Sequence, residues 1–76
     1  MEKQRGRILS DLQEFAENIK QVEGKADARI IDLAKRYASD AGYFLEKGDF
    51  FTAWGCINYA HGLLDALREE RVRRKH

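Results

Sequence analysis

The stretch from Asp40 to Asp65 constrains the fold of this 76-residue chain more than any other part of it. It holds the end of an amphipathic segment, the dipeptide Gly48-Asp49 and the start of a second segment with few charges. Glycine at a helix C-terminus, followed by an aspartate, is typical of one helix ending and the next beginning at an N-cap. So short a connection makes the two helices antiparallel neighbours. The sequence therefore predicts a helical hairpin at the centre of the fold.

Hydrophobic residues recur at helical spacing in three segments, and each set defines one buried face. The first set is a narrow seam of Ile8, Leu12, Phe15, Ile19 and Val22. The second set is Ile30, Ala34, Tyr37, Ala38, Ala41, Phe44 and Leu45. The third set is Phe50, Ala53, Ile57, Ala60, Leu64 and Leu67. We therefore predict an all-α fold, a three-helix antiparallel up-and-down bundle with helices near residues 4–23, 26–47 and 49–72.

Small and polar residues indicate where these helices end and how closely they pack. Gly24 is the predicted break after the first helix, because glycine leaves the helical region most easily. Asp27 is placed to cap the second helix. Ala34, Ala38 and Ala41 line the inner face of that helix, and side chains of this size let two helix axes approach closely. We expect another helix to lie tightly against this face.

The composition favours one small helical domain spanning residues 1–76. The chain is 43% hydrophobic and 36% charged and contains no proline, which is typical of a soluble helical protein. A single cysteine makes no internal disulfide, so nothing in the chain requires an oxidising compartment. There is no apolar run near the ~20 residues of a membrane span, and the first residues lack the apolar core of a signal peptide. We expect a cytoplasmic protein without membrane association.

The net charge of +1 conceals an uneven distribution. Residues 1–7 carry a net +2, residues 8–67 a net −4 and the tail at 68–76 a net +3. Both basic ends are candidates for contacts with nucleic-acid phosphates, although short basic ends are more often simply solvated. The candidate phosphate contacts of the tail are Arg71, Arg73, Arg74 and Lys75. In an up-down-up bundle the two basic ends lie at opposite ends of a monomer.

The outer side of the third helix is unusual because it carries no charge. Only one residue from 50 to 67 is charged, and the side opposite the seam comprises Phe51, Gly55, Asn58, Tyr59, Gly62 and Ala66. A solvent-facing side normally shows Lys and Glu. Each glycine inside a helix also costs about 1 kcal/mol relative to alanine, which a close contact would offset. We therefore predict that this side binds a second copy of the chain, as a homodimer, or another protein.

A polar strip follows one flank of the same helix. Asn58, His61 and Asp65 are spaced at i, i+3 and i+7, and Asp40 of the second helix is placed to face them. A metal site would need more ligands than this strip supplies. We favour a structural role, in which an aspartate accepts a hydrogen bond from His61, a tyrosine or a backbone group. Cys56 lies at the edge of the core and is interpreted as a small hydrophobe, so we predict no catalytic residue and no cofactor.

The run from Tyr37 to Leu67 resembles the archaeal domain-of-unknown-function family three hundred and fifty-seven. The family pattern is Y-x-x-D-A-x-Y-F-L-x-x-G-D followed by Y-A-x-G-L-L-D-A-L. The matching residues are Tyr37, Asp40, Ala41, Tyr43, Phe44, Leu45, Gly48, Asp49, Tyr59, Ala60, Gly62, Leu63, Leu64, Asp65, Ala66 and Leu67. The resemblance implies a small antiparallel helical bundle from an archaeon and no activity. It gives no support for residues 1–36.

These observations favour a non-catalytic module for protein–protein interaction or scaffolding that self-associates through its third helix. The alternative is a small nucleic-acid-binding protein that uses its basic N- and C-terminal ends. Salt dependence distinguishes the two, because phosphate binding weakens steeply as salt is added.

Overall fold

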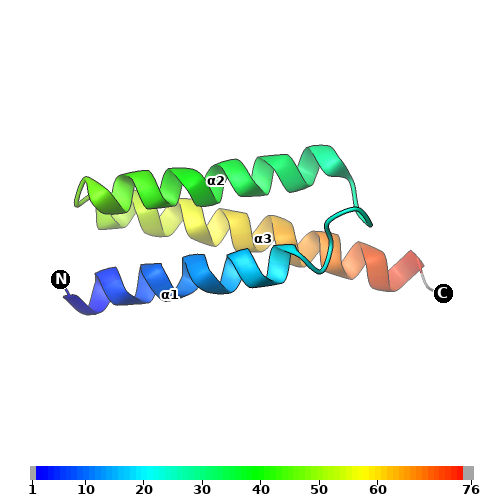
Figure 1. Cartoon of the computed structure of the whole chain (residues 1–76), viewed down its shortest axis with the longest axis horizontal. Helices are drawn as coiled ribbons and strands as arrows, with labels where there is room; N and C mark the ends of the chain where they lie inside the picture. Colours follow the sequence, from blue (N-terminus) through cyan, green and yellow to red (C-terminus); the bar gives the residue numbers. More distant parts are fainter. Residues whose placement is uncertain (1, 75–76) are drawn as a thin grey trace.

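A computed structural model describes the backbone of residues 2–74 and the side chains of residues 3–69. Three helices make up the fold: α1 (Glu2–Ile19), α2 (Ala28–Glu46) and α3 (Phe50–Arg74). They run up, down and up along an elongated body of 45 × 20 × 16 Å (Figure 1). No strand occurs in the described part of the chain. The predicted all-α, three-helix antiparallel bundle is confirmed.

Two aspartates cap the starts of α2 and α3, as predicted. The Asp27 carboxylate accepts a hydrogen bond from the Arg29 backbone N–H at 2.9 Å. The Asp49 carboxylate accepts one from the Thr52 backbone N–H at 3.1 Å. Hydrogen bonding to the Thr52 side chain, and then to its backbone, lowers the pKa of Asp49. Each carboxylate thus satisfies an N–H group that has no partner inside its helix.

The turn between α2 and α3 depends on Gly48, whose φ is +81°. The Gly48 N–H donates to the Leu45 carbonyl at 3.1 Å, and the Asp49 N–H donates to the Phe44 carbonyl at 2.9 Å. This pair of bonds is the Schellman motif, which closes a helix on a left-handed residue. Because the next helix begins directly after Asp49, α3 folds back along α2.

The connection between α1 and α2 differs from the prediction. We expected the first helix to run to residue 23, but α1 ends at Ile19. The N–H groups of Val22 and Glu23 both donate to the Ile19 carbonyl at 3.2 Å, so the chain continues in tight turns. Val22 is fully buried within this segment. Gly24, the predicted break, has a φ of +75° but lies within these turns, after α1 has ended.

The core runs along the axis between the three helices. Its main cluster consists of Phe15, Ile19, Val22, Ile31, Ala34, Ala41, Ile57, Ala60, Leu64 and Leu67. A smaller cluster near the α2–α3 turn consists of Ile8, Leu45 and Ala53. All the residues predicted to face inward are buried or half-buried. Ile31 is the addition, since the sequence pattern placed only Ile30 on the inner face of α2.

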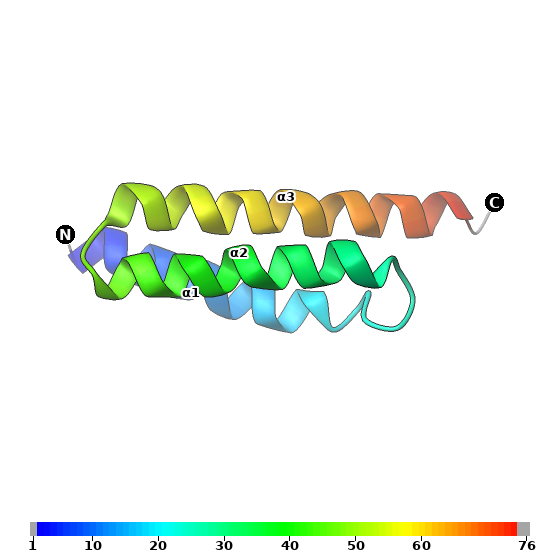
Figure 2. The same ribbon diagram turned by 90° about the horizontal axis from the view of Figure 1, so that it is seen from above.

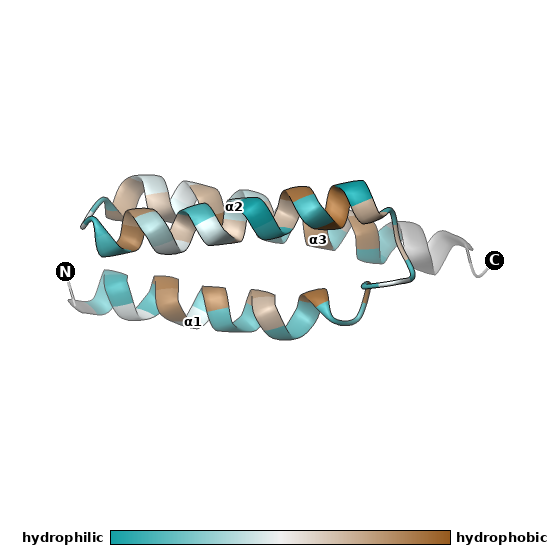
Figure 3. Cartoon of the chain, turned by 45° about the horizontal axis from the view of Figure 1, so that its top comes forward, coloured by the Kyte–Doolittle hydropathy of each residue, from teal (hydrophilic) through white to brown (hydrophobic). Residues whose placement is uncertain are grey.

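α2 and α3 form the most extensive contact in the fold. Ala34 and Ala41 of α2 and Ala53 and Ala60 of α3 have no exposed surface, whereas Ala38, the third small residue predicted on this face of α2, is half-buried. α1 lies along one side of this pair (Figure 2) and has the smaller contact with each partner. In Figure 3 the hydrophobic positions of α1 stand as separate bands on an otherwise hydrophilic helix. The other side of the α2–α3 pair is left uncovered by α1.

Candidate functional site

The outer side of α3 is exposed along its whole predicted length. We call its six residues the α3 outer face: Phe51, Gly55, Asn58, Tyr59, Gly62 and Ala66. Phe51 has 87% of its surface exposed, and Tyr59 has 51%. None of the six side chains carries a charge. The face is therefore uncharged and open within one chain, and it presents two aromatic rings to solvent.

The two glycines of the α3 outer face have no packing role inside the chain. A methyl group added at Gly55 or at Gly62 would meet no atom within 4 Å beyond the local helix backbone. The close contact that the sequence predicted for them is therefore not made within this chain. Both lie inside the continuous helix α3, where alanine would be more favourable, so their presence has no explanation within one chain.

Tyr59 packs against α2 at the edge of the face. Its ring meets the ring of Tyr37 from α2 in an edge-to-face arrangement, with centroids 4.5 Å apart and planes at 66°. Pairs with this geometry contribute about 0.5–1.5 kcal/mol beyond the burial of their surface. A ring that already packs against a neighbouring ring loses less side-chain entropy when a partner covers it than a ring without such a contact.

The polar strip predicted around His61 is not gathered on one site. With its proton on Nε2, His61 donates to the Asp11 backbone carbonyl of α1, at 3.0 Å. The same ring lies edge-to-face against Phe15 of α1, with centroids 5.8 Å apart. His61 therefore faces α1, and its acceptor is the backbone carbonyl of Asp11, whereas we had predicted an aspartate carboxylate as the acceptor. The other members, Asp40, Asn58 and Asp65, are exposed.

The chemistry that the remaining candidate groups can perform is limited. Cys56 is half-buried against the core, and burial raises the pKa of its thiol, with further contributions from the charges of Asp40 and Asp49. A raised pKa keeps the thiol protonated and makes it a poor nucleophile. In the described part of the chain, no three His, Cys, Asp or Glu side chains lie close enough to hold a metal ion.

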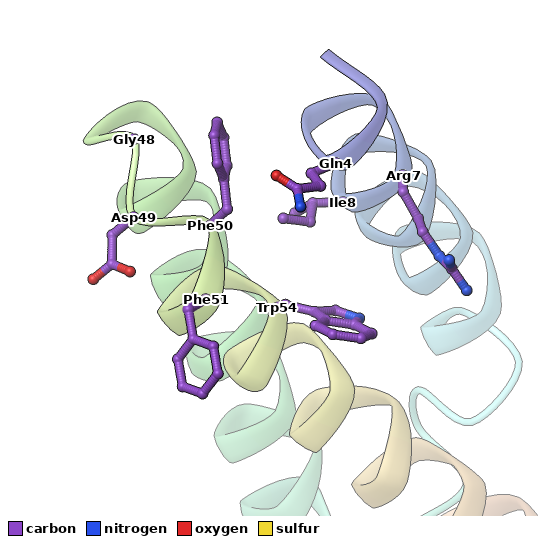
Figure 4. A pocket seen from close by; sticks show the side chains of 8 residues that line it. All are labelled: Gln4, Arg7, Ile8, Gly48, Asp49, Phe50, Phe51 and Trp54. Carbon is purple, nitrogen blue, oxygen red and sulfur yellow. The ribbon is translucent and has the colours of Figure 1, made fainter. Parts of the chain in front are cut away.

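Sequence reasoning missed a hollow of about 590 Å³ between the first turns of α1 and the start of α3. Its lining residues are Gln4, Arg7, Ile8, Gly48, Asp49, Phe50, Phe51 and Trp54. Figure 4 shows Gln4 and Ile8 pointing toward α3, and Trp54 pointing toward α1. The available signal was Trp54, a large aromatic next to the α3 seam, which remains 47% exposed. The hollow adjoins the α3 outer face, because Phe51 belongs to both.

The basic ends are separated in the fold. Lys3, Arg5 and Arg7 are exposed on the first turns of α1. The last turns of α3 lie at the other end of the long axis (Figure 1), as expected for an up-down-up bundle. The predicted phosphate contacts fall outside the residues whose side chains are described; they are Arg71, Arg73, Arg74 and Lys75. Among the described residues, no helix is both long and apolar enough to cross a lipid bilayer.

The fold and this surface define a small all-α protein built on a closely packed helical hairpin, with an uncharged helix face turned outward. A family model described as "Protein of unknown function (DUF357)" matches residues 9–72. The chain therefore belongs to the DUF357 family. The match includes more than half of α1, so it extends well beyond the run from 37 to 67 that carried the resemblance in sequence. No curated protein matches the chain.

Proposed function

We propose that this protein is a non-catalytic protein–protein interaction module that forms a homodimer through the α3 outer face. The observation that supports the proposal most is Phe51, a phenylalanine that exposes 87% of its surface. Full burial of a phenylalanine side chain is favourable by about 1.5–3 kcal/mol, so covering Phe51 would contribute to the free energy of association. Phe51 also shares its face with Tyr59, and aromatic residues are enriched at protein interfaces.

Other exposed apolar residues do not form a comparable surface. Leu9 of α1 is 50% exposed and Tyr43 of α2 is 57% exposed. The Tyr43 ring already contacts the Phe44 ring. The Lys47 ammonium lies over the Tyr43 ring, 5.4 Å from the centroid of that ring. Single exposed apolar residues are normal on a protein surface. The α3 outer face differs because its two aromatic residues lie beside uncharged positions, several of which have small side chains or none.

Analytical ultracentrifugation of the purified chain tests the proposal. One helix face is a small interface compared with the roughly 800 Å² per partner of a standard complex, so the protein should be examined up to about 1 mM. We expect a concentration-dependent dimer. Phe51→Ser should shift the equilibrium to monomer, whereas Leu9→Ser, which removes an exposed apolar group of α1 outside the α3 outer face, should leave it unchanged. A wild-type chain that stays monomeric throughout this range would refute self-association.

A further inference from the structure

We infer that the hollow between the first turns of α1 and the start of α3 is a binding site for a small molecule with an aromatic or apolar body and one acidic group. Binding here goes beyond the proposed self-association and does not depend on it. The hollow of about 590 Å³ falls in the range of roughly 300–1,000 Å³ that small-molecule sites occupy in proteins. Such sites combine mainly hydrophobic and aromatic walls with a few polar groups, and this hollow has both.

The walls of the hollow are mainly aromatic. Phe50, Phe51 and Trp54 come from the start of α3, and Ile8 comes from α1. Phe51 and Trp54 are exposed and Phe50 is half-buried, so a bound molecule would cover apolar surface that water now reaches. Covering such surface is favourable by about 25 cal/mol per Å². These residues therefore provide the contact for the apolar body of the ligand.

Polar groups without partners line the same hollow. The side chains of Gln4, Arg7 and Trp54 make no hydrogen bond or ion pair with any described residue. Figure 4 shows Gln4 pointing toward α3 and Trp54 pointing toward α1. The amide and the indole N–H are hydrogen-bond donors, and a guanidinium binds a carboxylate through two parallel N–H bonds. Arg7 is therefore the group that would hold an acidic ligand.

The charges around the hollow favour an acidic group on the side of α1. Residues 3–10 carry three exposed cations, Lys3, Arg5 and Arg7, and no acidic residue. Asp49 also lines the hollow, but its carboxylate already caps α3. In Figure 4 Asp49 lies across the hollow from Arg7 and points away from it. Residues 46 and 47 carry opposite charges, so Arg7 has no neighbouring acid of the α2–α3 turn that would replace a ligand.

Two fluorescent dyes with the same body test this assignment. Anilinonaphthalene sulfonate has an aromatic body and one acidic group, and phenylnaphthylamine has that body without the acid. Trp54 is the single tryptophan of the chain and lines the hollow, so its fluorescence reports binding. Titration at a chain concentration that the ultracentrifuge shows to be monomeric separates this test from self-association. We expect the sulfonate dye to bind at one site per chain and to quench Trp54.

Matched variants of α1 locate the site. Gln4→Phe should abolish the binding of both dyes, because a phenyl ring at this position fills the hollow. Gln13→Phe makes the same change at an exposed position of α1 outside the hollow and should have no effect. Arg7→Gln should weaken binding of the sulfonate dye by about three- to fivefold, as expected for the loss of one partly exposed ion pair, and leave the uncharged dye unaffected. Arg5→Gln, the same change outside the hollow, should leave both dyes unaffected.

Other results overturn the site or the class of its ligand. No binding of the sulfonate dye up to about 1 mM, or equal binding by Gln4→Phe and the wild type, would refute the site. Equal binding of the sulfonate dye by Arg7→Gln and Arg5→Gln would refute the acidic group. Should circular dichroism show that Gln4→Phe loses its helices, the smaller Gln4→Leu should still weaken both dyes. A chain that binds the dye and stays monomeric at every concentration would refute the dimer alone.

Discussion

At the scale of single residues, Gly48 shows how a backbone conformation limits the sequence. Its φ of +81° is a left-handed conformation, and the two hydrogen bonds of the α2–α3 turn depend on it. Glycine adopts this conformation without strain, whereas a residue with a Cβ atom does not. The space around Gly48 is open, so any effect of a substitution would come from the backbone alone.

A matched pair of glycine substitutions tests this argument. Gly48→Ala should lower the free energy of unfolding by about 1–2 kcal/mol, because alanine is strained at positive φ. Gly42→Ala should raise it by up to about 1 kcal/mol, because Gly42 lies inside α2 with open space around it and alanine favours the helix. Urea denaturation followed by circular dichroism measures both. Changes of the same sign in the two variants would contradict the assignment.

The residue scale also separates what local sequence predicts from what it does not. Asp27 and Asp49 cap helices through residues two or three positions away, so the sequence around each was enough to predict the cap. His61 finds its partner fifty residues away, at the Asp11 carbonyl. That contact depends on how α1 is rotated and placed, which no local pattern specifies. Its acceptor was therefore not identifiable before the structure.

At the scale of elements, the sequence predicted the packing of the inner side of α3 but not the surroundings of its outer side. Its inner seam follows helical spacing, and Ile57, Ala60 and Leu64 are fully buried as predicted. The composition of its outer side was equally readable, and the structure leaves all six of its residues exposed. The end of α1 was predicted four residues too late, because the hydrophobic seam continues to the buried Val22 although the regular helix ends at Ile19. The helical spacing of hydrophobic residues continues from Ile19 to Val22, so the pattern did not reveal the turn between them.

The glycines of the α3 outer face give opposite expectations for folding and for association. Gly55→Ala and Gly62→Ala should each stabilise the monomer by up to about 1 kcal/mol, because alanine is the better helix former and the space inside the chain is open. The same methyl groups should weaken the dimer, because they separate two closely packed backbones. Denaturation at low concentration measures the first effect, and sedimentation measures the second.

Gly42→Ala is the control for this pair, because it makes the same change on α2, outside the α3 outer face. It should stabilise the monomer and leave the dimerisation constant unchanged. If Gly55→Ala and Gly62→Ala behave in the same way as Gly42→Ala, the glycines have no role in self-association. The crossed result, a more stable monomer and a weaker dimer, is what distinguishes an interface from a tolerated pair of glycines.

At the scale of the whole molecule, the order and direction of the helices were predictable because the connections are short and well marked. The hollow between α1 and α3 was not predictable, since it lies between the first turns of α1 and the residues Phe50 and Trp54 of α3. Helical periodicity predicts which side of a helix faces inward. It does not predict the distance or tilt at which that helix settles on its neighbours.

The unequal packing of the three helices has a consequence for how the protein opens. α2 and α3 are joined by a tight turn and share an alanine-lined contact, whereas α1 adds the smaller contact and borders the hollow. Weakly packed segments open by sub-global unfolding before the rest of a protein. In native-state hydrogen exchange, the amides of α1 should therefore exchange faster than those in the middle of α2 and α3. Equal protection in all three helices would mean that the bundle opens as a single cooperative unit.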